Sequence, residues 1–139
     1  MLLQFRANYK PTALKRPRLV RNTVVYDPSK KDKKDWLKTV LHCIPKVAFK
    51  GPLKINLQFF FPRPKNHFRT GKYKDQIKSS APIIHTFMPD IDNLSKFILD
   101  AMNEHFFEDD RQVVELSAHK EYINDYYNNK GYTIVTIYE

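Results

Sequence analysis

The stretch that decides the fold is PDIDNLSKFILDAM, residues 89–102. Its apolar residues recur at helical spacing. At about 100° per residue, Asp92, Lys96 and Asp100 fall on the side opposite to the apolar residues. Asp90 stands at the start of the pattern. The stretch therefore predicts an amphipathic helix, with one face in the core and the other carrying carboxylates and one ammonium.

Charge is divided unevenly along the chain. Residues 1–89 hold 20 Lys and Arg against 4 Asp and Glu, whereas residues 90–139 hold 4 against 11, which gives the net charge of +9. A basic surface attracts polyanions, but clustered carboxylates repel phosphate unless a divalent cation lies between them. The simplest explanation for a basic chain with an acidic cluster is a metal-dependent enzyme that acts on nucleic acid.

Composition limits the classes of protein to which the chain can belong. A chain of 139 residues, 42% of them hydrophobic, can bury one core, so we expect a single domain over residues 1–139. Cys43 is the one cysteine and permits no intrachain disulfide. No apolar run approaches the roughly 18 residues that span a bilayer, and residues 1–9 lack a signal-peptide core, so we expect a cytoplasmic protein. With three glycines the chain cannot form a glycine-rich phosphate loop, which argues against a nucleotide cofactor.

Periodicity predicts the other elements. A helix is expected over about residues 29–43 and a central strand over 54–61. A short strand is expected at 23–25. Residues 112–123 and 132–138 favour two further strands, which we expect to pair antiparallel. The predicted fold class is α/β of the α+β kind: a small mixed or antiparallel sheet with two helices, the second carrying the acidic site.

Two basic segments lie around these elements. The first is an arm rich in Pro, Lys and Arg, about residues 10–34. The second is a loop, about residues 62–89, that shows no period and mixes cations with Phe68 and Tyr73. This mixture suits phosphate contacts and base stacking, and loops of this length are usually functional or disordered. A solvated basic loop is the alternative interpretation.

The acidic face predicts a metal site. Mg²⁺ and Mn²⁺ prefer converging carboxylate oxygens and keep waters for the substrate. Asp90 could aim alongside Asp92, and residues 106–110 could fold back to bring in another carboxylate. Such a metal would polarise the scissile phosphate and supply hydroxide. Lys96 would stabilise charge on the phosphate or assist a proton transfer.

Each of these residues also has a purely structural interpretation. Asp90 fits an ordinary N-cap, and Asp92 fits a first-turn acid favoured by the helix dipole. Lys96 fits an i, i+4 ion-pair ladder with its acidic neighbours, worth about 0.2–0.5 kcal/mol per pair. Asp109 and Asp110 fit a turn. On a chain this basic, the joint pattern favours catalysis.

Other metal sites have weak support. A calcium EF-hand is excluded because Leu94 and Ser95 stand where a ligand and the glycine are needed, and Ala101 replaces the closing glutamate. The histidines form no His-x-x-x-His pair and no Cys-x-x-Cys occurs, so a zinc site is poorly supported. His67 and His85 lie in the basic loop, where they could contact DNA.

The acidic stretch also resembles the signature of a known family, the RusA-type Holliday junction resolvases. The resemblance rests on residues 88–103, MPDIDNLSKFILDAMN, and residues 109–114, DDRQVV. Further agreement lies in residues 16–18, 25–30 and 62–67, and in His85. It covers most of the chain and is least distinctive over the last twenty residues, 120–139.

This resemblance implies a homodimer in which each subunit carries a magnesium-dependent site that nicks one strand of a four-way DNA junction. By motif position it assigns Asp90, Asp92 and Asp110 as metal-binding acids and Lys96 as the catalytic lysine. Asp100 and Asp109 match supporting positions. Many relatives have Lys where this chain has Met88, which removes a cation near the site but leaves the metal ligands.

The sequence thus predicts an endodeoxyribonuclease of DNA recombination and repair that uses Mg²⁺ or Mn²⁺ to resolve Holliday junctions by paired symmetric nicks. A homodimer fits because a four-way junction has near two-fold symmetry and the chain has one acidic cluster. Two alternatives stay open: a nuclease for other branched DNA, and a non-catalytic basic DNA-binding module. DNA contacts are expected from Arg16, Arg18, Arg21, Lys65, His67, Arg69, Lys72, Lys74, Arg111 and Lys120.

Overall fold

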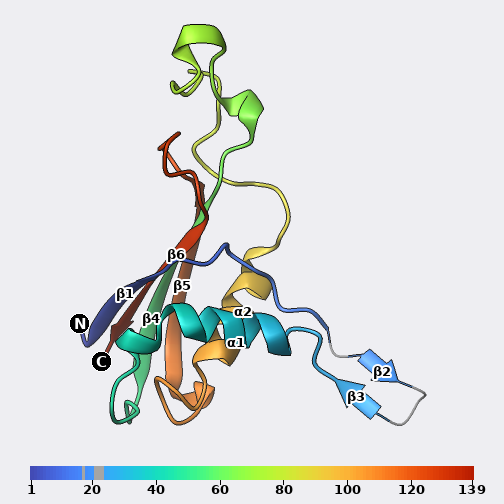
Figure 1. Ribbon diagram of the computed structural model, residues 1–139. Helices are drawn as coiled ribbons and strands as arrows, with labels where there is room; N and C mark the ends of the chain where they lie inside the picture. Colours follow the sequence, from blue (N-terminus) through green and yellow to red (C-terminus); the bar gives the residue numbers. More distant parts are fainter. Residues whose placement is uncertain (17, 21–23) are drawn as a thin grey trace.

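A four-stranded mixed sheet with two helices against one face forms the body of the protein (Figure 1). The computed structural model describes residues 1–16, 18–20 and 24–139. The helices and strands are β1 (Leu3–Ala7), β2 (Arg18–Val20), β3 (Val24–Tyr26), α1 (Lys30–Thr39), β4 (Leu53–Phe61), α2 (Ile91–Met102), β5 (Val113–Tyr122) and β6 (Tyr132–Tyr138). This architecture is the predicted α+β class.

Strand β4 is central, as its sequence predicts. Every second residue from Leu53 to Phe61 is buried, because alternate side chains point to opposite faces and one face meets the helices. The strand pairs antiparallel with β6 and parallel with β5. The strand order is β1-β6-β4-β5, which leaves β5 at one edge.

The predicted antiparallel pairing of the last two strands is wrong. β4 lies between β5 and β6, so neither pairs with the other. The connection from β4 to β5 contains α2, and a crossover of that length brings the next strand back parallel. Strands that are neighbours in sequence pair only about two-thirds of the time, and here residues 123–131 pass over the end of β4.

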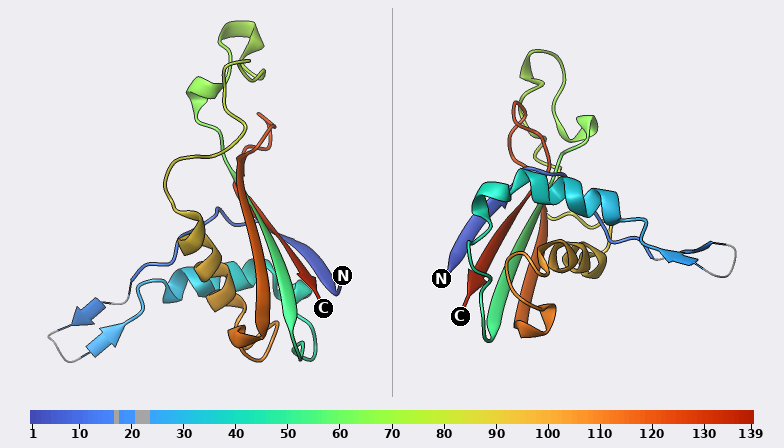
Figure 2. Two further views of the ribbon diagram at one scale, coloured as in Figure 1. Left: turned by 180° about the vertical axis from the view of Figure 1, so that it is seen from behind. Right: turned by 60° about the horizontal axis from the view of Figure 1, so that its bottom comes forward.

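The N-terminal region differs from the expectation in three places. β1 was not predicted; it pairs with β6 and buries Phe5 and Ala7. The short strand is one side of a hairpin formed by β2 and β3, which projects from the body (Figure 2), and Thr23 lies outside the described residues. α1 ends at Thr39 rather than near residue 43, because a separate 3₁₀ turn follows at Leu41–Cys43.

Helix α2 has the predicted amphipathic character. Five of its apolar residues are at most 2% exposed and pack against the sheet in one core with Trp36 of α1 and Leu57 of β4; they are Leu94, Phe97, Ile98, Ala101 and Met102. Asp92, Lys96 and Asp100 are exposed on the other side. No helix in the described ranges is both long and apolar enough to cross a membrane.

Residues 62–81 rise beyond the end of the sheet as an arm that has only two short 3₁₀ turns, at Lys65–His67 and Gly71–Tyr73 (Figure 1). The arm stands beside the connection between β5 and β6, residues 123–131. A return segment, residues 82–89, then leads from the arm to α2. The expectation of a long loop without a period is met.

Leu57→Ala should destabilise the protein by about 2–5 kcal/mol, because Leu57 is fully buried between the sheet and both helices and its truncation leaves a cavity. Gln58→Ala, on the opposite face of the same strand, should cost much less. Urea unfolding of both variants measures the difference. Equal losses would contradict the assignment of the two faces.

Candidate active site

The N-terminus of α2 borders a pocket of about 770 Å³, here called the acidic pocket. Asp90 and Asp92 line it from the start of the helix, and Lys120 lines it from the edge strand β5. His85, Phe87 and Met88 of the return segment supply another wall. Two predicted metal-binding acids therefore share one cavity.

Neither carboxylate is used by the fold. Asp90 occupies the N-cap position with an extended backbone (φ −69°, ψ 146°), yet its side chain makes no capping hydrogen bond. Its backbone carbonyl instead accepts from the Leu94 amide at 3.1 Å. Within the described part of the chain, Asp92 has no side-chain hydrogen bond or ion pair either. The capping interpretation of Asp90 is therefore wrong, and both carboxylates are free to bind a ligand.

Lys120 fixes the backbone that leads into Asp90. Its Nζ donates to the carbonyl oxygens of Phe87 and Pro89, each at 2.7 Å. Burial lowers the pKa of Lys120, while attraction to Asp90 acts in the opposite direction. The sequence predicted a DNA contact for this lysine; the structure directs two of its three N–H donors to main chain beside Asp90.

The predicted ion-pair ladder on α2 does not form. Lys96 is exposed and has no carboxylate within 4.0 Å among the described residues. Asp100 instead lies 3.9 Å from Lys33 of α1, whose ammonium also pairs with Asp27. Lys96 thus keeps its charge available one turn beyond Asp92, and the pair of Lys33 with Asp100 joins α1 to α2.

Asp109 and Asp110 differ in their environments. Asp109 caps a 3₁₀ turn in a capping box with Gln112, and its carboxylate is 3.2 Å from Arg111. The Arg111 amide, which donates to Asp109, lowers the pKa of Asp109. Burial raises the pKa of Asp110, and repulsion from Asp109 and Asp100 adds to the effect. The turn interpretation holds for both residues, because Asp110 begins the 3₁₀ turn that Asp109 caps, and the Asp110 carboxylate is additionally repelled by other carboxylates.

Two of the three predicted metal-binding acids line the acidic pocket. Asp90 and Asp92 share the acidic pocket, while Asp110 does not line it and is coupled electrostatically to Asp100. Among the residues that the structure describes, no three His, Cys, Asp or Glu side chains gather closely enough to hold a metal ion. Mg²⁺ is often bound through one or two carboxylates plus waters and phosphate, so the pair in the acidic pocket fits Mg²⁺. The three-acid ligand set stays a prediction.

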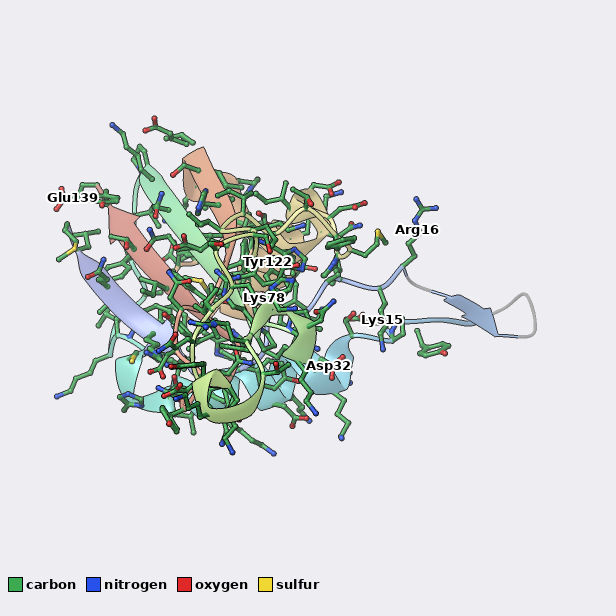
Figure 3. The ribbon with its side chains drawn as sticks, turned by 90° about the horizontal axis from the view of Figure 1, so that it is seen from above. Lys15, Arg16, Asp32, Lys78, Tyr122 and Glu139 are labelled. Carbon is green, nitrogen blue, oxygen red and sulfur yellow. The ribbon has the colours of Figure 1, made fainter. Side chains whose placement is uncertain are left out.

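The predicted DNA-binding residues are spread over several surfaces. Arg16 is exposed and points away from the body beside the hairpin, whereas the neighbouring Lys15 pairs with Asp32 at 4.0 Å (Figure 3). Arg21 and the side chain of Arg18 lie outside the described residues. Arg111 is paired with Asp109. The cations of the arm are exposed: Lys65, Arg69, Lys72 and Lys74.

Two buried side chains of the loop have roles that the sequence did not indicate. Arg63 is 4% exposed and holds the base of the arm to residues 123–129. His85 is 8% exposed and stacks on Phe61 with ring centroids 3.9 Å apart. Burial lowers the pKa of His85, and the nearby Lys120 adds to the effect. The aperiodic loop gave no signal of burial beyond the Pro-Arg-Pro spacing at residues 62–64.

Comparison with known proteins agrees with the resemblance of the acidic stretch. Residues 8–138 match the family described as endodeoxyribonuclease RusA. The chain is also similar to the uncharacterized protein YqaN of Bacillus subtilis (strain 168), with 32% identity over 125 residues, which covers 86% of this chain and 87% of that protein. Both matches include the acidic pocket and the arm.

The buried His85 should make folding stability depend on pH. Because its pKa is lowered in the folded protein, the unfolded chain binds a proton at a higher pH, near the ordinary value of about 6.5. Stability is therefore greatest above that pH and falls as the pH drops toward the lowered folded pKa. His85→Phe keeps the stack on Phe61 and should flatten the decline in melting temperature between about pH 7 and 5. His67, whose pKa is also lowered, should leave a residual slope. An identical slope in the variant would contradict this origin.

Proposed function

The chain belongs to the RusA endodeoxyribonuclease family, and from that premise we propose that it resolves Holliday junctions by paired, divalent-metal-dependent nicks. Family membership supports an endodeoxyribonuclease of Holliday junctions; the metal and the paired nicks are our proposal. The observation that carries it is the pair Asp90 and Asp92, which line one pocket and whose carboxylates have no hydrogen bond or ion pair among the residues that the structure describes.

The proposed role of these acids is to hold Mg²⁺ or Mn²⁺. When bound, such an ion supplies Lewis-acid activation of the scissile phosphate and a hydroxide nucleophile. Asp90 and Asp92 would hold it, and Asp110 is the third ligand that the family motif implies. Lys120 would keep the Asp90 carboxylate in place through the Phe87 and Pro89 carbonyls. Fixing the main chain before Asp90 limits the positions that its carboxylate can take when the metal arrives.

Lys96 is the proposed catalytic lysine. It extends from the exposed face of α2, and no carboxylate neutralises it in the described structure. An unpaired ammonium near the phosphate can stabilise the charge that develops in the transition state. It can also offset the repulsion between the acids and the DNA backbone before metal binds.

A homodimer is the assembly that fits this reaction. Each chain carries one acidic pocket lined by Asp90 and Asp92, and a four-way junction presents two strands related by near two-fold symmetry. Two coordinated nicks then require two subunits. A nuclease for other branched DNA is the alternative, and cleavage of a panel of flaps, forks and four-way junctions discriminates between the two.

Asp90→Asn and Asp92→Asn should each abolish nicking of a four-way junction in Mg²⁺ while binding persists. The basic surface rather than the acids supplies affinity, and loss of a carboxylate reduces its repulsion of phosphate. Asp35→Asn is the matched control, because it removes one negative charge from α1, outside the acidic pocket. Single-turnover cleavage and gel-shift titration give the two readouts. Wild-type rates in both pocket variants would defeat the metal-site proposal.

Mixed dimers of wild-type and Asp92→Asn subunits should nick a junction once and rarely resolve it, because each subunit provides one site. Differently tagged subunits, purified as the mixed species, can be assayed on a plasmid-borne junction, where single and paired nicks give different products. Full resolution by the mixed dimer would contradict one site per subunit. Paired nicking by a sedimenting monomer would contradict the dimer itself.

A further inference from the structure

A second pocket, of about 420 Å³, lies in the arm and is here called the arm pocket. Four of its lining residues are cations, Arg63, Lys65, Arg69 and Lys74. Phe68, Tyr126 and Asn129 complete the lining, and no carboxylate takes part. Its volume falls within the range of about 300–1,000 Å³ that is typical of small-molecule sites.

Arg63 distinguishes the arm pocket from a group of mobile surface lysines, because its side chain is buried and fixed by hydrogen bonds. It is 4% exposed, and its guanidinium donates to the carbonyls of Ile123 at 2.8 Å and Pro82 at 2.7 Å. It also donates to Asn124 Oδ1 at 2.8 Å. All of these acceptors are neutral. The guanidinium also lies 3.3 Å from His67 Nδ1, and within the described part of the chain no carboxylate pairs with this buried charge.

The other three cations are likewise without acidic partners. In the described structure, Lys65, Arg69 and Lys74 have no carboxylate within 4.0 Å. Asp75 is the one acid between residues 62 and 89, and its carboxylate accepts from the Tyr127 hydroxyl at 3.2 Å. A concave surface lined by charges of one sign concentrates the electric field and attracts an ion of the opposite sign.

The walls of the arm pocket are held in place by packing. Phe68 is 4% exposed and meets Tyr126 edge to face, with ring centroids 5.1 Å apart. Asn129 donates to the Arg63 carbonyl and accepts from the Arg63 amide, each at 2.8 Å. The arm and the β5–β6 connection thus form the two sides of one pocket, which does not have to assemble when a ligand arrives.

We propose that the arm pocket binds a phosphodiester of the DNA at a point separate from the one that is cut. This inference rests on the proposed function, because it takes DNA as the ligand. The arm pocket and the acidic pocket have no lining residue in common. A junction held at both places is fixed in orientation, whereas one held only near the acids can rotate about the scissile phosphate.

The first test is a pair of double variants with equal changes in charge. Lys65→Gln with Arg69→Gln removes two cations from the arm pocket, and Lys72→Gln with Lys78→Gln removes two from the same arm outside it. The pocket variant should lose at least about tenfold more junction affinity than the control, since one charge-assisted hydrogen bond contributes on the order of a factor of ten. Its log–log salt slope should fall by about 0.9 more, as one lost phosphate contact predicts. Equal losses of junction affinity in the two double variants would overturn the proposal that the arm pocket binds a phosphodiester.

The second test locates the phosphate. Single phosphates of a synthetic four-way junction are replaced by neutral methylphosphonates, and binding is measured without Mg²⁺. Replacement of one phosphate that lies away from the cut should weaken binding by the wild-type protein about tenfold. The same replacement should leave binding by the Lys65/Arg69 variant unchanged. Absence of any such position, or one that affects both proteins equally, would overturn the proposal.

Nicking by the wild-type protein in Mg²⁺ is measured on the same unmodified junction. Failure to nick, with the methylphosphonate pattern intact, would defeat the proposed function and leave the arm pocket as a phosphate site.

Discussion

The burial of helix α2 under the sheet is the constraint on which the rest of the structure depends. Leu94, Phe97, Ile98, Ala101 and Met102 are at most 2% exposed, so the rotation of the helix about its axis is fixed. At about 0.8 kcal/mol for each buried CH₂ group, any rotation that exposed this face would cost more than most polar contacts return. Asp92, Lys96 and Asp100 consequently have nowhere to face but solvent. The crossover that carries α2 also makes β5 parallel to β4 and places Lys120 beside the first turn of the helix. The packing of α2 against the sheet thus determines both the order of the strands and the position of Lys120 in the wall of the acidic pocket.

Two charged groups are positioned by the fold without being neutralised by it. Asp90 stands where an N-cap would contribute about 1 kcal/mol to the helix, yet its carboxylate makes no capping bond. Arg63 is buried among neutral acceptors, although a buried cation without a counterion carries a desolvation cost of several kcal/mol. Stability alone favours neither arrangement. The Asp90 carboxylate can still accept a cation. The N–H groups of Arg63 are occupied by neutral acceptors, but its positive charge still adds to the field that attracts an anion to the arm pocket. Both departures from good local chemistry therefore lie at the places where we propose ligand binding.

The sequence predicted those features that depend on local periodicity. The amphipathic pattern of α2 and the alternation of β4 each identify a buried face without reference to the rest of the chain. Sheet order is different, because it depends on which strand edges remain free after the crossover has packed, and the pairing of β5 with β6 was predicted wrongly for that reason. The role of Lys120 likewise depends on carbonyls about thirty residues away in sequence. The candidate acids were predicted by type and spacing and stay predictions. Which of them line one pocket depends on tertiary packing, so the absence of Asp110 from the lining of the acidic pocket could not be derived from spacing.

The return segment, residues 82–89, couples the arm to the acidic pocket. The Pro82 carbonyl accepts from Arg63 at the base of the arm, and the Ile83 carbonyl accepts from the Tyr122 amide at 2.9 Å. Farther along, Lys120 holds the Phe87 and Pro89 carbonyls directly before Asp90. A segment without regular structure normally moves easily, but this one is hydrogen-bonded to Arg63 and to β5 near both of its ends. Since β5 is paired with β4 along its length, the base of the arm cannot shift relative to Asp90 without breaking these bonds. The direction in which the arm leaves the sheet is therefore linked to the geometry of the acidic pocket, and DNA bound at both pockets, as we propose, would be held in one orientation.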